Sequence, residues 1–401
     1  MAASSSAVQV RVLEETSPGV IGTGNPQRYR VSGESLTQSI ETVRSQELRA
    51  DRMTPDSVIT AGSAGGALNF ELSHKTHDTF FEALLAGEFV PVGTNGVVTI
   101  SDATFSAVDN SINSAGGDIP HALLEVGQWF SISGAADPEN NGIFRVSPTT
   151  APTANKLVVD SQQATLETNA VATSVVLSSS RLKNGLEPLR TFTIEKEFSD
   201  ISQFFTFTGM GVQSMSLEFS TGSILTGSFN FLGRQCTRGT VSGFPGIAGE
   251  IDATDTPVFN SVIGTQVMLD DAPIGDSCAN SLSISVETGL RELRCISSGI
   301  GAADLNVGTF VITMTTELYF SGNTAAVYDK MITGSPLSLA ICVSDDEGNG
   351  LAFVTNRCKI ASSEVVAGGI DQDVVMSITV DATLDHGSNS MLIIDRIGSI
   401  A

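Results

Sequence analysis

Two histidines three residues apart come closest to a metal-binding pattern in this sequence. His74 and His77 lie in the segment SHKTHD, and histidines at short spacing can bind Zn²⁺ together with a further protein ligand. No cysteine lies near them, and no third ligand is evident. We therefore expect solvated or helix-capping histidines and no bound metal.

The other motifs that could support chemistry are incomplete. The segment DDEGNG at 345–350 resembles the start of a calcium loop, but Asn356 occupies the position of the bidentate glutamate. The segments GTGNPQ and GMGVQS lack the third glycine of a dinucleotide-binding loop. Glu195 and Glu197 alternate along a predicted strand, as on a solvent-facing edge. The sequence thus predicts no catalytic residue, no cofactor and no metal, and it favours a structural role.

The composition indicates an acidic, folded protein. Of its 401 residues, 41% are hydrophobic, which suffices for the cores of two or three domains. Asp and Glu number 44 against 21 Lys and Arg, so the formal net charge is -23 and the surface should repel nucleic-acid phosphates. The five scattered cysteines predict no disulfide framework, and neither a signal peptide nor a membrane span is expected.

The clearest helix signal lies at residues 76–87, in the segment THDTFFEALLAG. Thr79 and Glu82 have the spacing of a capping box, and Gly87 would end the helix. One apolar stripe would be formed by Phe80, Phe81, Leu84 and Leu85.

The order of features around this helix returns later in the chain. SLTQSIET at 35–42 is followed by ELR, a Gly/Ser-rich loop, an alternating strand and the helix, and SLSISVET at 281–288 is followed by ELR, a strand and the segment NTAAVYDKMITG at 323–334. A duplicated domain explains this shared order, and two unrelated β domains are the alternative. The second helix would pack through Val327, Tyr328, Met331 and Ile332.

These patterns predict a mainly β protein with two tandem β-sandwich domains, each with one flanking α-helix, and a small inserted all-β domain. Trp129 should be a core residue of the inserted domain. The expected division is an N-terminal arm at 1–26, a first domain at 27–95 and 184–235, the inserted domain at 96–183, a linker at 236–280 and a second domain at 281–401.

The segment IETVRSQELRADRMTPD, a Gly/Ser-rich loop and GALNFELSHKTHDTFFEALLAG follow one another in this order. This arrangement resembles the major tail tube proteins of bacteriophages with long flexible tails. The resemblance covers residues 27–90 well and the C-terminal segment DVVMSITVDATLD more loosely. It implies sandwich domains of the tail tube type and a structural virion protein that is synthesised in the bacterial cytoplasm.

In that family six sandwich domains close into a ring, and the rings stack into a tube through which the genomic DNA passes. This sequence departs from the family in its apparent duplication. With a duplicated domain three chains would supply the six domains, as a trimer with pseudo-sixfold symmetry, and a hexamer of single-domain subunits is the alternative. A loop at 49–66, with Arg49, Asp51, Arg52 and Asp56, would reach the neighbouring ring, and residues 295–308 would be its shorter counterpart. Further implied partners are other tail proteins, such as the tape measure and terminator proteins.

The acidic excess predicts a negative channel wall that lets DNA pass without specific binding. The inserted domain has no part in closing a barrel, so it should project outward, and deleting 96–183 should leave assembly intact. A secreted or surface β-repeat protein such as an adhesin is a second hypothesis. A β-sandwich enzyme acting on carbohydrate is a third.

Overall fold

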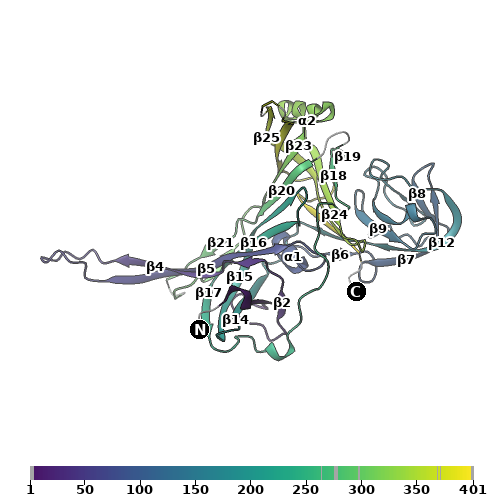
Figure 1. Cartoon of the computed structure of the whole chain (residues 1–401). Helices are drawn as coiled ribbons and strands as arrows, with labels where there is room; N and C mark the ends of the chain where they lie inside the picture. The colour runs from purple at the N-terminus through teal and green to yellow at the C-terminus, as the bar shows by residue number, and fades with distance from the viewer. Residues whose placement is uncertain are drawn as a thin grey trace.

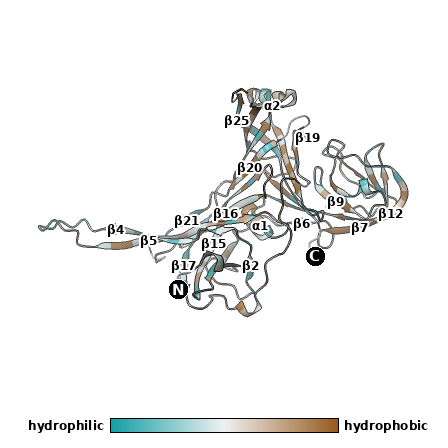
Figure 2. Cartoon of the chain, viewed as in Figure 1, coloured by the Kyte–Doolittle hydropathy of each residue, from teal (hydrophilic) through white to brown (hydrophobic). Residues whose placement is uncertain are grey.

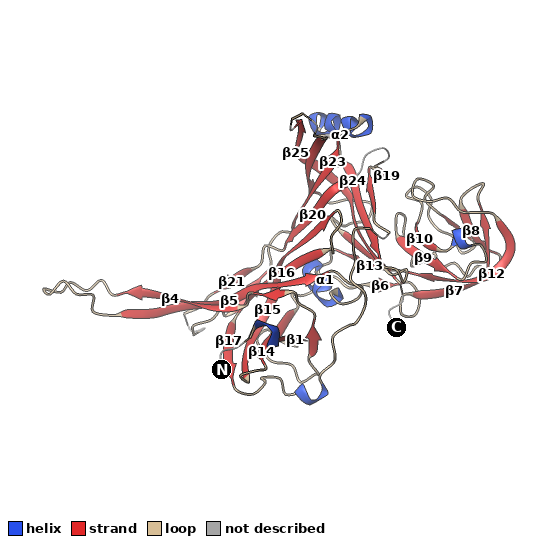
Figure 3. Ribbon diagram, viewed as in Figure 1, coloured by secondary structure: helices blue, strands red, loops and turns tan. Residues whose placement is uncertain are grey.

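The chain is mainly β, as the alternating apolar pattern predicts (Figure 3). The computed structural model describes residues 4–262, 264–274, 279–296, 299–367, 369–370 and 372–398. Within these residues, nineteen strands belong to one network of antiparallel pairs, six form a separate sheet and two form a short hairpin, and there are two α-helices.

Two groups of five strands repeat one pairing order. The first half runs β4–β5–β16–β15–β14 and the second half runs β20–β23–β26–β25–β24. The first half comprises β4 (Thr37–Arg44), β5 (Ser57–Glu71), α1 (Asp78–Leu85), β14 (Thr191–Phe198), β15 (Gln203–Ser220) and β16 (Thr226–Gly233). The second half comprises β20 (Ala279–Glu287), β23 (Val311–Tyr319), α2 (Gly322–Thr333), β24 (Leu337–Ser344), β25 (Gly350–Ala367) and β26 (Val374–Ala382).

A shared core lies inside both halves, because alternate residues of these strands face inward. Along β15, Met215, Leu217 and Phe219 are buried while the residues between them are more exposed. The inward residues of both halves form one continuous apolar cluster. The halves are joined directly where β15 pairs with β20, with Leu217 opposite Ile284.

Shorter strands extend the network at its margins. They are β1 (Val8–Glu14), β2 (Gln27–Tyr29), β3 (Gly33–Glu34), β6 (Val90–Pro91), β13 (Ser180–Lys183), β17 (Gln235–Gly239), β18 (Gln266–Leu269), β19 (Ala272–Pro273) and β27 (Ile393–Ile397). The segment expected as an arm thus contains β1, which pairs with β14 and buries Val10. The segment expected as a linker contains β18, β19 and most of β17.

Residues 97–178 form the inserted module, a separate sheet with its own apolar core (Figure 1). Its strands are β7 (Val97–Ser106), β8 (Ser111–Ser114), β9 (Trp129–Ser133), β10 (Gly142–Arg145), β11 (Lys156–Val158) and β12 (Asn169–Ser178). Three single 3-10 turns complete the chain, at Ser5–Ala7, Pro138–Asn140 and Ile247–Gly249.

Trp129 is buried, but it does not belong to the core of the inserted module. Its side chain lies in a separate apolar cluster with residues of the second half. Those residues are Met268, Ala340, Cys342, Ala352, Val354, Ile393 and Ile397. Trp129 is thus a core residue, but the prediction that it belongs to the core of the inserted domain was wrong. A strand pattern indicates that a residue is buried and does not specify which segment covers it.

Two ion pairs lie beside the contact between the inserted module and the rest of the chain. Asp395 of β27 is fully buried; it accepts a hydrogen bond from the Trp129 backbone N–H at 2.9 Å and pairs with Arg181 of β13 at 2.6 Å. Arg145 of β10 pairs with Asp271 beside β19 at 2.6 Å. The module is thus docked beside the second half, since Trp129 and Arg145 are buried there, whereas the Asp271 side chain is 46% exposed.

Candidate assembly surfaces

A long hairpin of β4 and β5 extends from the body of the molecule (Figure 1). The two strands pair from Thr37 opposite Gly65 to Arg44 opposite Ser57, and residues 45–56 form the connecting loop. The predicted loop residues lie in or at the end of this tip and are Arg49, Asp51, Arg52 and Asp56.

The expectation of a loop over the whole of 49–66 was wrong, because residues 57–66 belong to β5. This part of β5 consists largely of Ser, Ala and Gly, so the sequence shows no apolar alternation. Its glycines allow close neighbours. A Cβ atom on Gly65 would lie 2.7 Å from the carbonyl oxygen of Phe231, and one on Gly62 would lie 2.8 Å from Ile300.

Apolar residues are exposed along the hairpin and at its tip, and Figure 2 colours hydrophobic residues on its strands brown. They are Ile40, Val43, Leu48, Met53, Val58 and Ile59. The side chains of Leu48 and Met53 have relative exposures of 103% and 68%. The only ion pair described within the tip joins Arg49 to Asp51 at 2.6 Å. A protruding apolar surface of this kind marks a contact site for another molecule.

A shorter hairpin occupies the corresponding place in the second half. Its strands are β21 (Arg291–Leu293) and β22 (Asp304–Asn306). It lies against the long hairpin, since the N–H of Gly62 donates to the carbonyl of Ile300 at 2.7 Å. Of the predicted counterpart loop at 295–308, residues 297–298 lie outside the described residues.

Two of the open strand edges in the described part of the chain belong to the repeated groups of strands. Strand β25 is the counterpart of β15 in the second half. Residues 214–220 of β15 pair with β20, whereas residues 362–367 of β25 pair with β26 alone and leave their other side open. We call residues 362–367 the β25 edge. At the other end of the molecule, β3 and β4 pair with β5 alone, and we call residues 33–38 the β3–β4 edge.

One side of the sheet that runs from β5 to β25 is polar. Hydroxyl groups pair across strands on it, with Ser216 and Ser228 at 2.9 Å and Thr315 and Thr379 at 3.3 Å. Alternation with the buried residues also places six carboxylates on this polar face. They are Glu71, Glu218, Glu287, Glu317, Glu364 and Asp381.

Helix α1 is covered on its apolar side. The four residues of the predicted stripe, Phe80, Phe81, Leu84 and Leu85, are each at most 1% exposed. The capping-box prediction was wrong, because the helix begins at Asp78, so Thr79 is not its N-cap. Its end was also misplaced by one residue: Ala86 adopts the left-handed conformation, and a Cβ on Gly87 would lie 2.5 Å from the carbonyl oxygen of Lys183.

Helix α2 is more open. Val327 is buried and Met331 is partly buried, whereas Tyr328 and Ile332 are 39% and 69% exposed. Gly334 ends this helix in the left-handed conformation, as its spacing predicts. The same face is thus covered on α1 and partly uncovered on α2.

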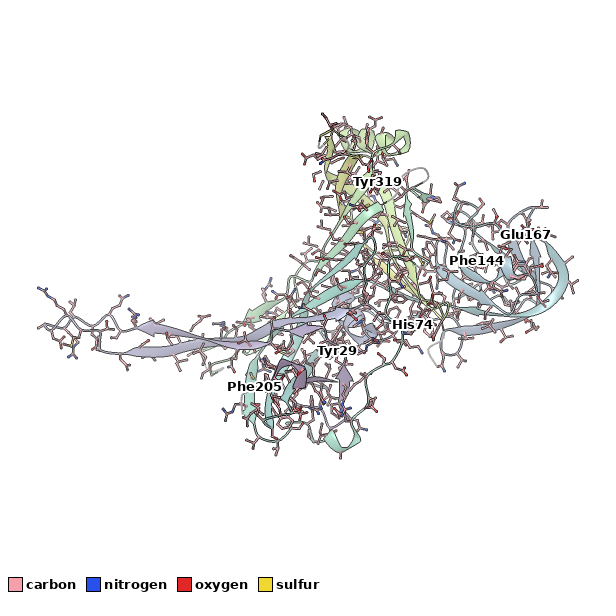
Figure 4. All side chains as sticks on the ribbon, viewed as in Figure 1. Tyr29, His74, Phe144, Glu167, Phe205 and Tyr319 are labelled. Carbon is pink, nitrogen blue, oxygen red and sulfur yellow. The ribbon has the colours of Figure 1, made fainter. Side chains whose placement is uncertain are left out.

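Both histidines of the candidate metal motif are buried and not solvated; Figure 4 labels His74. His77 occupies the N-cap position of α1, in line with the alternative expectation of a helix-capping residue, but its side chain makes no capping hydrogen bond. The His77 ring lies between the Tyr29 hydroxyl and the carbonyl of Glu71. Burial lowers the pKa of His77 to about 3 and, together with the nearby charge of Arg396, that of His74 to about 4. They are neutral core residues, and the described residues contain no cluster of His, Cys, Asp and Glu that could hold a metal ion.

A comparison with protein families gives a match over most of the chain. Residues 5–383 match the family model described as the phage tail tube protein. The chain belongs to this family. The resemblance noted in the sequence is thereby confirmed, and the tail tube protein is a structural component of the virion tail rather than an enzyme. A comparison with curated proteins finds no match.

Membership of the family means that this tail tube protein self-assembles, so its functional residues are those that meet other copies. The sequence predicted the hairpin tip as such a surface, which stays a prediction, and it did not locate the two strand edges, because an edge is set by which strands pair and not by any residue type. Cys236, Cys342 and Cys358 are free thiols. Cys278, another of the five cysteines, lies outside the described residues. Neither described helix is long and apolar enough to cross a membrane.

Proposed function

We propose that three copies of this tail tube protein close into a ring with pseudo-sixfold symmetry, in which each half of the chain supplies one of six equivalent sandwich domains. The repeated pairing order of the two halves carries this proposal. In this division the first domain takes 27–95 and 184–235 and the second takes 281–401. A hexamer of chains that each fill one position is the alternative.

Ring closure would use the β25 edge of one copy and the β3–β4 edge of the next. Both long strands carry a bulge at the same place, between Val212 and Ser214 in β15 and between Ile360 and Ser362 in β25. Ser362 therefore corresponds to Ser214. Within the chain, Ser214 lies opposite Glu287 and Leu217 opposite Ile284.

The same correspondence gives the register between copies. Thr37 opposite Gly65 matches Ser285 opposite Thr313. In the ring Glu364 would then lie opposite Thr37 of the next copy, and Val365 opposite Leu36. Val365 is 39% exposed in the single chain, and this pairing would cover it. Pairing two open edges also removes an aggregation hazard.

The polar face would then line the channel. Its hydroxyl groups and carboxylates present negative charge and few strong donors to a phosphate backbone, which supports passage of genomic DNA without specific binding. The inserted module would lie outside the channel, because it docks on the second half away from the polar face. A channel wall with a net positive potential in a reconstructed tube would contradict this assignment.

The long hairpin would contact the neighbouring ring through its exposed tip. Residues Arg49, Asp51, Arg52 and Asp56 give the tip its charged groups, and Leu48 and Met53 its apolar ones. Stacking of identical rings by such head-to-tail contacts produces an open filament. The first and last rings would leave one such surface free for other tail proteins, such as the tape measure and terminator proteins.

A cysteine cross-link tests the ring. Thr37 and Glu364 are both exposed in the single chain, and the double variant T37C/E364C, with Cys295→Ser, should form disulfides between copies on oxidation. Denaturing electrophoresis should show a ladder that ends at three chains, and native mass spectrometry of the smallest ring should give the same number. Each single cysteine variant is the control. A ring of six chains, or no cross-link in chains that assemble, would refute the proposed closure.

A further inference from the structure

The backbone of Leu36 points its hydrogen-bonding groups out of the sheet. The N–H of its neighbour Ser35 donates to the carbonyl of Ala67 on β5 at 2.9 Å. In an antiparallel pair successive residues point their N–H and C=O groups to opposite sides. The N–H and C=O of Leu36 therefore face away from β5, toward the open β3–β4 edge, although the Leu36 side chain is buried.

Two side chains satisfy these backbone groups. The N–H of Leu36 donates to Oε2 of Glu34 at 2.9 Å, and the carbonyl of Leu36 accepts from Nζ of Lys196 at 2.7 Å. Lys196 and Glu34 also form an ion pair at 3.2 Å. Buried backbone groups are rarely left unpaired, so this pair completes the edge in the single chain.

Packing fixes Lys196 in this position. It projects from β14, and its ammonium group lies 5.7–5.9 Å from the ring centres of Phe198, Phe205 and Phe207. The Lys196 and Glu34 side chains are only 13% and 16% exposed. The pair is thus an ordered contact and not a mobile surface ion pair, since aromatic faces attract a cation at this range.

In the second half, a paired strand occupies the place that the Lys196–Glu34 pair occupies beside Leu36. The residue of the second half that corresponds to Leu36 is Ile284, and Ile284 lies opposite Leu217 of β15. A neighbouring strand therefore occupies the side that Lys196 and Glu34 occupy in the first half. The two arrangements exclude each other at the Leu36 carbonyl, because one acceptor side cannot face both a lysine and a strand.

We propose that Lys196 and Glu34 are an edge guard, which blocks strand addition to the β3–β4 edge until a second copy of this chain displaces the lysine. This rests on the ring closure proposed above. Charged side chains on an edge strand are a general means of preventing unwanted pairing. The guard makes the free chain soluble and places a kinetic barrier before assembly, while the completed ring regains the hydrogen bonds as backbone pairs.

Two substitutions at one position test the guard in opposite directions. Lys196→Met keeps the apolar stem against the phenylalanines and removes the charge. The lag before ring formation, followed by light scattering, should therefore shorten by about tenfold or more, as expected for the loss of one hydrogen bond from a charged donor. Lys196→Arg keeps the pair and adds a second donor for Glu34, so it should lengthen the lag. Lys156→Met, which breaks an ion pair with Asp109 on the inserted module, is the control.

A measurement on the unassembled chain separates the guard from simple destabilisation. At a concentration too low for rings, hydrogen exchange of the Leu36 amide should be faster in Lys196→Met than in the wild type, while exchange in the core of β16 stays unchanged. Rings that form from all three variants with the wild-type lag would overturn the guard and leave the ring intact. If the wild type itself forms no rings, the proposed closure fails and the guard with it.

Discussion

Arg396 of β27 forms an ion pair with Asp78 in the first turn of α1. The two residues lie in opposite halves of the chain, so this pair fixes the helix of the first half against the last strand of the second. Arg396 also lies over the ring of Phe89, at 4.5 Å from its centre. The contact is therefore part of the boundary between the halves and not an isolated surface pair.

Asp78 makes the stability of the chain depend on pH. Burial raises the pKa of Asp78 from 3.8 to about 6, against the opposing effect of Arg396. Between these two values the folded chain holds a proton that the unfolded chain releases, so this group's contribution to stability is lost as the pH rises from about 4 to about 6. The free energy of unfolding, wild type minus Asp78→Asn, should fall by roughly 2–3 kcal/mol over this window.

Urea denaturation of unassembled protein at four or five pH values measures this difference. Asp51→Asn is a suitable control, because the hydrogen bond from Arg49 lowers the pKa of Asp51 and the corresponding difference should not fall. A wild-type minus Asp78→Asn difference that stays level or rises from pH 4 to 6 would show that Asp78 ionises normally in the folded chain.

Truncation of Trp129 should destabilise the docking of the inserted module. Its side chain is fully buried against the second half, and removing a buried aromatic side chain costs about 3–5 kcal/mol. Trp129→Ala should therefore lower the melting temperature by several degrees, measured by calorimetry. Val171→Ala, at a position 71% exposed on the same module, should leave it unchanged.

Deletion of the module should have a stronger effect than the sequence suggested. Removing 97–178 exposes the apolar residues that Trp129 covers, and a deletion that extends to residue 183 also removes β13, which pairs with β27. We expect aggregated protein in size-exclusion chromatography instead of assembling tubes. Tubes of normal diameter from the deletion variant would restore the view that the module is a removable appendage.

A charge on the apolar side of α1 should prevent folding. Phe81→Asp or Leu84→Asp places a carboxylate in a site that is completely buried, and a buried unpaired charge costs several kcal/mol at least. These variants should be insoluble on expression. Ile332→Asp, at a 69% exposed position of α2, is the matched substitution and should remain soluble; equal solubility of all three would mean that α1 is dispensable for the fold.

The hairpin tip should be needed for stacking but not for ring closure. Leu48→Ser together with Met53→Ser removes two exposed apolar side chains and leaves the β-pairing of the hairpin in place. Negative-stain microscopy should show single rings in place of tubes. Val108→Ser, at a position 95% exposed on the inserted module, should give normal tubes, and normal tubes from the double variant would exclude the tip as the stacking contact.

Local residue patterns predicted the β class and the two helices. Alternation identified strands such as the inner part of β5, where Leu68 and Phe70 are buried, and the apolar stripe identified α1, because both patterns arise from one-sided burial. The failures share another cause. The outer part of β5 is built from small residues, so its strand state comes from pairing with β4 and β16 and leaves no mark in hydropathy.

Contacts between distant segments could not be predicted from the sequence either. Trp129 and Asp395 are joined by a hydrogen bond, and no periodicity within either segment specifies the other. The guard on the β3–β4 edge is of the same kind, since Glu34 and Lys196 each look like an ordinary surface residue in the sequence. The register of strand pairing is known only from the fold. It is this register that identifies Glu34 and Lys196 as residues to test by mutation.

The hydroxyl pairs on the polar face have a consequence for movement along a tube. In each of the pairs Ser216–Ser228 and Thr315–Thr379 one hydroxyl donates to the other across adjacent strands. This leaves one donor of each pair for a passing phosphate, and the net gain from such a bond in water is small. In the proposed ring such a wall would act as a low-friction lining. The speed of genome transfer would then be governed by water drag and driving pressure and not by the release of successive contacts.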